Sequence, residues 1–229
     1  MNIPSICLVE VDSGATGLDV IAAALTKQFT TDFPSYWNVA GTFRAATAAK
    51  PLLDSEWAFY LHNLPSSTDP TGALAYHYRT PAGLPAGNIF AGLCAQYGDP
   101  LPPTIGHEGA EALADPYLHR SVQDGKGTFW ALEVCDAVEG DTYDIDGIPM
   151  TNFCTPAWFE PPAAGATGTQ FDMMGLCSSA FQVRPNGGYA QPWDPTKGWT
   201  TVGTMRPYRA HLARLGLARG SRRAPGATP

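Results

Sequence analysis

The sequence predicts an α+β fold that carries a small β-rich addition near its C-terminal end. An apolar segment of strand character comes first, and apolar residues at helical spacing follow it. Several more strand-like segments then lead to a second helix, and this order fits an α+β domain. A Gly-rich region over residues 169–205 predicts short β segments joined by turns.

The first elements are defined by the spacing of their apolar residues. Residues 5–11 (SICLVEV) form an apolar run typical of a buried strand. Over residues 15–31 the apolar positions recur every three or four residues, which predicts an amphipathic helix, and Asp32-Phe33-Pro34 is expected to end it. Further strands are expected at residues 36–45, 56–62, 73–80 and 89–94, with a tight connection over residues 81–87.

A second helix is expected just after the prolines at positions 102–103, with Thr104 as its N-cap. It should end near Asp115, because Pro116 disfavours helical geometry in the residue before it. This helix is the one that carries the most distinctive motif of the chain.

Short β segments are expected beyond the second helix, at residues 129–134 and 142–153. Between them, Asp141, Asp144 and Asp146 lie in the sequence GDTYDIDG. Oxygen ligands at alternate positions would suit Ca²⁺, but the terminal Glu of an EF-hand loop is missing. A turn or hairpin is therefore the expected structure.

Composition divides the chain into an α+β domain (residues 1–160), a small Gly-rich β appendage (161–205) and an Arg-rich C-terminal tail (206–229). The sequence EPPAAGATG marks the first boundary as linker-like. With 44% hydrophobic residues among 229, the chain can build one sizeable core. An aromatic content of 11% argues against disorder, despite 24 Gly and 21 Pro residues.

The net charge of -7 disfavours nucleic acid as the main partner of the folded body. The tail differs, because it holds six of the 14 Lys and Arg residues; it is expected to be solvated, or else to dock on an acidic partner or nucleic acid. No secretion signal is visible, and no apolar run reaches the roughly 18 residues that a membrane span needs.

Five cysteines are spread widely along the chain, at positions 7, 94, 135, 154 and 177. Their number is odd and no CxxC is present. This pattern favours buried thiols in a reducing compartment, with one or two disulfides as the alternative.

The second helix carries the sequence HExxE, in which His107 and Glu111 are one helical turn apart and therefore share a face. In zinc peptidases, two metal ligands lie at this spacing and the Glu after the first ligand acts as general base, a position that Glu108 occupies. The second ligand position usually holds His, whereas this chain has Glu. The alternative interpretation is a solvated face of an ordinary helix.

A third ligand is expected downstream, because a catalytic zinc takes three protein ligands and keeps one position open for water. The candidates are Glu133 and Asp136, which follow Glu111 by 22 and 25 residues. In gluzincin-type peptidases the third ligand is a Glu at a similar distance beyond the second. We therefore prefer Glu133 as ligand and Asp136 as the residue that orients a ligand, with the reverse assignment left open.

These segments together resemble a family of small metallopeptidase-like proteins, which carry HExxE-xxx-DP followed by an E-[IV]-x-D segment. The matching segments are HEGAEALADP, EVCD, DIDG and TNFCTPAWF, and the region over residues 72–90 is similar to the family as well. Members occur in bacteria and, in the version closest to this chain, in tailed phages. The resemblance covers roughly residues 55–205, although Gly106 stands where members tend to carry Ser.

The resemblance implies a zincin-like fold in which residues 72–90 form the edge strand and turn that border the cleft. It also implies one Zn²⁺ ion, a peptide or protein substrate and hydrolysis by a metal-activated water with Glu108 as general base. Two carboxylate ligands would make the zinc a weak Lewis acid and would also accept Mn²⁺ or Ca²⁺, so a slow enzyme or a structural metal is expected.

The second hypothesis is a non-catalytic virion protein that uses the same fold as a decoration or attachment module. Its partners would be other virion proteins. The expected location is accordingly the bacterial cytoplasm or the phage virion, without a membrane partner.

Four other residues have both a structural and a functional interpretation. Asp115 is expected at the helix end or as a hydrogen-bond acceptor behind the ligands, and His119 in a solvated loop rather than as a ligand. His77 is expected to be packed or exposed, with a contact to substrate or transition state as the alternative. Cys135 could replace a carboxylate as a soft ligand, but a single Cys makes this the lesser alternative.

Overall fold

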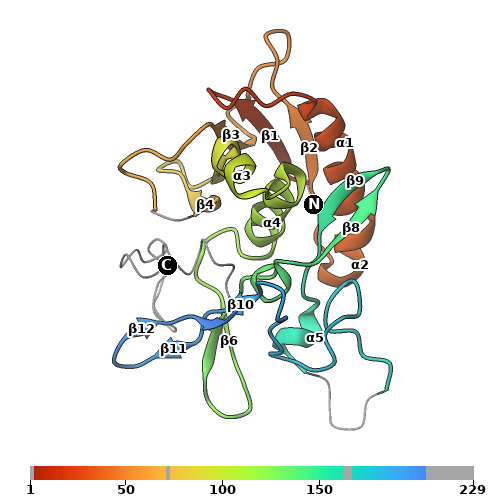
Figure 1. Cartoon of the computed structure of the whole chain (residues 1–229), viewed down its shortest axis with the longest axis vertical. Coiled ribbons are helices and arrows are strands. Elements are labelled where there is room, and N and C mark those ends of the chain that lie inside the picture. Colours follow the sequence, from red (N-terminus) through yellow and green to blue (C-terminus); the bar gives the residue numbers. More distant parts are fainter. Residues whose placement is uncertain (1–2, 71–72, 162–166, 205–229) are drawn as a thin grey trace.

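The computed structural model describes residues 3–70, 73–161 and 167–204, which fold around a five-stranded mixed sheet (Figure 1). The strand order is β2-β1-β3-β5-β4. The strands are β1 (Ser5–Glu10), β2 (Thr42–Ala45), β3 (Trp57–His62), β4 (Ala75–Arg79) and β5 (Pro85–Phe90). The first four in this order run parallel, whereas β4 lies antiparallel to β5 at the edge. The chain is thus a mixed α/β protein with parallel and antiparallel strand pairs.

Strand β1 lies inside the sheet between β2 and β3, and its apolar residues Ile6, Cys7 and Leu8 are fully buried. A strand covered on both faces needs a continuous apolar run, which explains why the sequence located it correctly. Strands β3 and β4 also fall within their predicted ranges.

The first helical region differs from the prediction at its end. Helix α1 (Leu18–Lys27) continues through a π-helical turn (Gln28–Asp32) into α2 (Phe33–Trp37). The prediction that Pro34 ends the helix, and that a strand begins at residue 36, is wrong. Pro34 occupies the first turn of α2, where no backbone N–H is required, and Asn38 in the left-handed conformation ends the helix instead.

The prediction for the region before the second predicted helix is also wrong in part. Strand β5 begins at Pro85, within the predicted connection, and α3 (Ala91–Tyr97) replaces the second half of the predicted strand at 89–94. The HExxE helix is α4 (Leu101–Ala114), which starts three residues before Thr104. Thr104 is therefore not the N-cap, and its hydroxyl donates to the Pro100 carbonyl at 3.0 Å. Asp115 is the C-cap of α4, as predicted.

The chain after α4 consists of short elements joined by turns. These elements are β6 (Ser121–Gln123), β7 (Phe129–Ala131), the 3₁₀ turn η2 (Asp136–Val138), β8 (Thr142–Ile145), β9 (Ile148–Thr151), α5 (Pro156–Phe159), β10 (Tyr189–Ala190), β11 (Trp193–Asp194), β12 (Gly198–Trp199) and β13 (Val202–Gly203). In Figure 1 the β8–β9 hairpin lies to the right of α4, and β6 and β10 to β12 lie below it. The predicted hairpin is confirmed, because β8 and β9 pair across a turn in which Asp146 and Gly147 both have positive φ.

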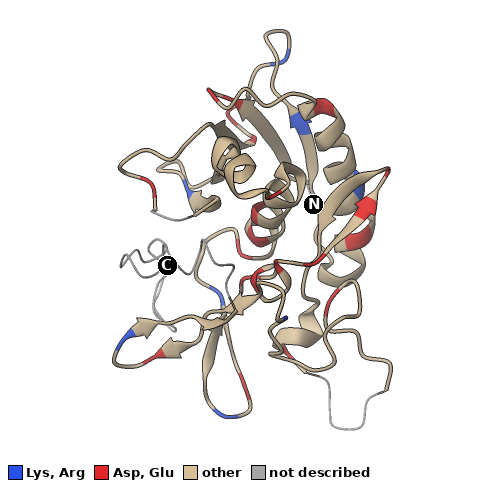
Figure 2. Ribbon diagram, viewed as in Figure 1, with Lys and Arg blue, Asp and Glu red and all other residues tan. Residues whose placement is uncertain are grey.

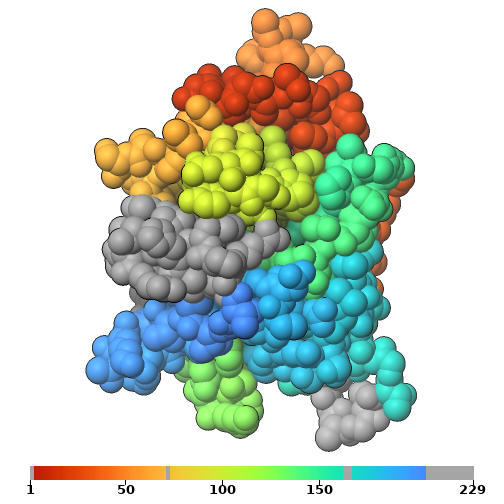
Figure 3. All heavy atoms as spheres, in the orientation of Figure 1, coloured from red at the N-terminus to blue at the C-terminus, as the bar shows by residue number. Residues whose placement is uncertain are grey.

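Residues 167–204, the described part of the predicted appendage, pack on the rest of the chain. Cys177 and Ala190 belong to the same buried apolar cluster as Trp158 and the sheet residues. The buried Asp172 carboxylate accepts a hydrogen bond from the Asn152 side chain at 2.8 Å. Figure 3 shows the blue C-terminal residues in contact with the green and cyan segments. The predicted tail over residues 206–229 lies outside the described residues.

All five cysteines are buried and none forms a disulfide bond, as the sequence predicted. No helix in the described part of the chain is both long enough and apolar enough to cross a bilayer. The cellular compartment stays a prediction.

Candidate metal centre

Helix α4 buries its motif residues at the centre of the molecule. His107, Glu108 and Glu111 are respectively 5%, 3% and 1% exposed, so a solvated helix face is excluded. The helix approaches the sheet closely, because a side chain at Gly109 would place its Cβ 2.8 Å from the Phe43 ring. Figure 2 shows acidic residues on α4 and on the segments below it, where Lys and Arg are few.

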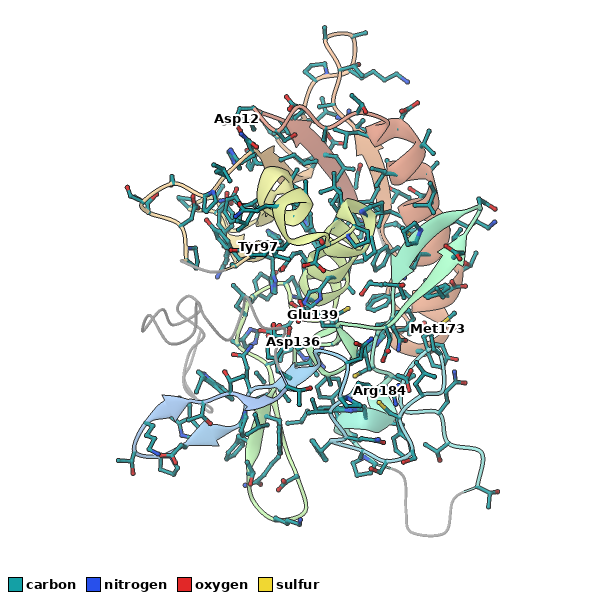
Figure 4. The ribbon with its side chains drawn as sticks, viewed as in Figure 1. Asp12, Tyr97, Asp136, Glu139, Met173 and Arg184 are labelled. Atoms are coloured by element: carbon teal, nitrogen blue, oxygen red, sulfur yellow. The ribbon has the colours of Figure 1, made fainter. Side chains whose placement is uncertain are left out.

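Asp136 joins the motif from the turn that follows β7. His107 Nε2 lies 3.1 Å from Glu111 Oε1 and 3.2 Å from Asp136 Oδ1. The three residues are buried, and their ligand atoms all lie within 4.8 Å of one another. Figure 4 shows Asp136 directly below α4.

His107 Nε2 faces two carboxylate oxygens at once, an arrangement that suits a metal cation better than a hydrogen bond. One N–H can point at only one of the two carboxylate oxygens, and no hydrogen bond of good geometry is formed by this nitrogen. An imidazole nitrogen with two carboxylate oxygens is a donor set that Zn²⁺ and Mn²⁺ accept. The residues therefore fit a divalent metal ion.

Groups behind the ligands hold two of them in place. The backbone N–H of Cys135 points at Glu111 Oε1 at 3.4 Å, and Gln191 Nε2 donates to Asp136 Oδ2 at 3.1 Å. Such contacts orient carboxylates toward a metal. Gln191 belongs to the C-terminal part of the chain, so the site draws on residues far apart in the sequence.

His77 of the edge strand β4 lies on the other side of the motif. Its Nδ1 is 3.0 Å from Glu108 Oε2 and 3.7 Å from Glu111 Oε2. The sequence left open whether His77 is packed or exposed, and at 9% exposure it is packed. The second group of potential ligands is formed by His77, Glu108 and Glu111, whose ligand atoms are also within 4.8 Å of one another.

The carboxylates and imidazoles of the cluster shift one another's pKa values. Burial opposes charge on His107, but the negative charge of Glu111 and the Asp136 carboxylate beside the ring raise its pKa well above the usual range. Burial also opposes charge on His77, yet the hydrogen bond to Glu108 raises the pKa of this residue as well. For Glu111, burial raises the pKa to about 8, against the opposing charge of His107.

Glu133, the preferred third ligand in the sequence argument, is half-buried and belongs to neither group of three. Its charge raises the pKa of both His77 and Glu111, so the carboxylate acts on the cluster electrostatically. In this arrangement Asp136 is the carboxylate next to His107, which favours the reverse assignment of the pair.

The remaining candidate residues belong to neither group of potential ligands. Asp115 accepts a hydrogen bond from the Arg120 backbone at 2.8 Å, and His119 Nδ1 lies 3.6 Å from the Asp115 carboxylate. The Cys135 thiol is buried, and burial raises its pKa well above the usual range. Of the hairpin aspartates, Asp146 pairs with Lys27 at 2.8 Å.

A pocket of about 430 Å³, which includes space open to solvent, reaches the cluster. Its lining includes His107 and Glu108, and Figure 4 shows Glu139, another lining residue, close to Asp136. The remaining lining residues are Leu74, Asp99, Pro100, Pro103, Thr104, Thr142 and Thr151. The pocket provides an approach from solvent to two motif residues of α4.

Sequence reasoning missed two features of the cluster. It did not place His77 beside Glu108, since nothing in a strand sequence tells which helix residue its side chain meets. It did not single out Gln191 at all, because a lone Gln in a Gly-rich region has no distinguishing signal.

Comparisons of the chain with protein-family models, with curated proteins and with solved structures give no match. The function is therefore argued from the site itself.

Proposed function

We propose that this chain is a zincin-like, metal-dependent hydrolase that cleaves peptide bonds, with one Zn²⁺ held by His107, Glu111 and Asp136. The observation that carries the proposal is the buried His-Glu-Asp cluster beside Glu108, the residue that the HExxE motif reserves for the general base. The pocket that reaches His107 and Glu108 supports access for a substrate.

A bound Zn²⁺ would supply a Lewis acid that polarises the substrate carbonyl and lowers the pKa of a water molecule. Glu108 is the residue that accepts the proton from the attacking water and gives it to the leaving amine. His77 holds the Glu108 carboxylate at 3.0 Å and thereby fixes its orientation.

The edge strand supports a peptide as the substrate. Among the described strands, β4 pairs with β5 alone, so its outer side lacks the strand partner that an extended peptide would supply. His77 of β4 contacts Glu108, which brings a peptide on this edge close to the general base. The two carboxylate ligands cancel the charge of the metal, and we expect slow turnover for this reason.

The test combines metal analysis with two substitutions and a matched control. We expect about one tightly bound zinc per chain and cleavage of a denatured protein substrate. Glu108→Gln should keep the metal and lose activity by a factor of 10² or more, as removal of a general base does. Glu111→Ala should lose the metal and the activity.

The exposed Glu160 provides the control, since Glu160→Gln should change neither quantity. A protein without stoichiometric metal, or a Glu108→Gln variant as active as the parent, would overturn the proposal.

One observation favours the second candidate, a virion structural protein on the same fold. His107 and Glu108 are at most 5% exposed, a degree of burial that suits a structural metal. Under this alternative the chain holds one metal, Glu111→Ala destabilises the protein, and neither the parent nor Glu108→Gln cleaves a peptide.

A further inference from the structure

The Glu111 carboxylate faces a different histidine with each of its oxygens. Oε1 lies 3.1 Å from His107 Nε2, whereas Oε2 lies 3.7 Å from His77 Nδ1. A carboxylate with ligand atoms on both sides has the arrangement that bridges two metal ions. Metal pairs in hydrolases lie roughly 3.5–4 Å apart.

The His77 side of Glu111 has the same types of donor atom as the His107 side. It offers one imidazole nitrogen and two carboxylate oxygens, one of which comes from Glu108. All three residues are at least nine-tenths buried, and His77 turns its Nδ1 toward both carboxylates.

We propose that His77, Glu108 and Glu111 form a second divalent-cation site, which shares the Glu111 carboxylate with the site formed by His107 and Asp136. The ligand atoms would be His77 Nδ1, Glu108 Oε2 and Glu111 Oε2.

The balance of charge supports two cations. When they act as ligands, Glu108, Glu111 and Asp136 carry a charge of -3, and the half-buried Glu133 lies near enough to act on them. One divalent ion leaves this buried cluster negative, which is costly in a low-dielectric interior. A second divalent ion brings the cluster with Glu133 to neutrality.

Occupation of the second site has a consequence for catalysis that rests on the proposed function. A carboxylate that binds a cation is a weaker base, so Glu108 cannot then accept the proton of the attacking water. Zinc in excess of one equivalent is therefore an inhibitor of the enzyme.

The experiment measures zinc per chain by equilibrium dialysis and elemental analysis over a range of free zinc concentrations. The parent chain should take up two ions per chain. His77→Gln and His107→Gln should each take up one. His62→Gln should still take up two, because His62 lies about one-third exposed beside Asp12 and outside both groups. Circular dichroism establishes that each variant is folded.

A parent chain that saturates at one zinc ion, or a folded His77→Gln variant that still binds two, overturns the second site. A measurement on the parent chain guards against variants that do not fold. With two equivalents of Mn²⁺, a bridged pair gives a spin-coupled electron paramagnetic resonance spectrum, whereas the six-line spectrum of isolated Mn²⁺ alone contradicts the proposal.

Failure of this inference is distinguishable from failure of the proposed function. If the chain binds two zinc ions but cleaves no peptide, the second site is supported and the proposed hydrolase function fails. If the chain cleaves a peptide but saturates at one zinc ion, the hydrolase function is supported and the second site fails.

Discussion

His107 and Glu111 show how burial changes the chemistry of single residues. The pKa of His107 is raised by the carboxylates around it, and burial raises the pKa of Glu111 to about 8. Without a metal, these residues therefore keep their protons to higher pH, and the bound protons stabilise the cluster. With a metal, the same ligands must release their protons, so binding of the metal is favoured as pH rises.

We predict that the chelator-treated protein becomes less stable between about pH 5.5 and pH 8.5. Glu111 has a pKa near 8 in the folded chain instead of the usual 4.5, so over this range the folded state binds more protons than the unfolded state. The raised pKa values of His107 and His77 act in the same direction above 6.5. The free energy of unfolding in urea, measured at several pH values, should fall as pH rises.

Glu111→Gln is the control for this pH dependence, because an amide has no proton to release, and it should flatten the slope. Glu56 does not interfere: the hydrogen bond from Arg44 lowers its pKa to about 2, and it titrates below this range. Stability that stays constant or increases toward pH 8.5 would contradict the prediction.

At the scale of the element, the close packing of α4 on the sheet depends on a glycine at the contact. Ten consecutive residues, from Ile105 to Ala114, are buried. Gly109 faces the Phe43 ring, which itself packs against Phe29 and Phe59. Close packing of helix and sheet is what sets His107 and Glu111 in the interior.

We predict that Gly109→Ala destabilises the protein by up to about 2 kcal/mol, because overpacking costs about 1–3 kcal/mol and the better helix propensity of Ala returns roughly 1 kcal/mol. The new Cβ would lie 2.8 Å from Phe43 Cζ. Urea denaturation is the measurement. Gly125→Ala is the control, because a Cβ there meets no atom within 4 Å. Equal stability of Gly109→Ala and the parent would show that the helix can shift without cost.

At the scale of the whole molecule, the candidate site is assembled from distant parts of the chain. β4 supplies His77, α4 supplies the motif, and the turn after β7 supplies Asp136. Gln191, close to β10, then fixes the Asp136 carboxylate. The geometry of the candidate metal centre therefore depends on the C-terminal part of the fold.

We predict that Gln191→Leu weakens zinc binding by about 10- to 100-fold, as loss of a contact behind a ligand does. Competition with a chromophoric chelator measures the affinity. Gln123→Leu is the control, because the Gln123 side chain donates its hydrogen bond to the nearby Gly127 carbonyl within the β6–β7 hairpin, away from the ligands. Unchanged affinity in Gln191→Leu would mean that Asp136 needs no support or is not a ligand.

The sequence by itself determined the local features of this protein. Buried strand β1, amphipathic α1, the HExxE helix α4 and the β8–β9 hairpin all have a periodicity or a turn signal that acts within a few residues. The same local spacing placed His107 and Glu111 on one face of α4. Pro34 shows where a local signal is ambiguous, because a proline can mark either the end or the first turn of a helix; the prediction of a helix end was wrong.

Only the tertiary structure decided which side chains meet. Asp136 rather than Glu133 lies next to His107, His77 contacts Glu108, and Gln191 supports Asp136. Each of these pairs joins residues more than twenty positions apart, and their contact depends on how strands and turns pack. Spacing along the chain nominated both Glu133 and Asp136 but did not decide between them, and it gave no signal for His77 or Gln191, because these contacts are set by how the strands and turns pack around the common core.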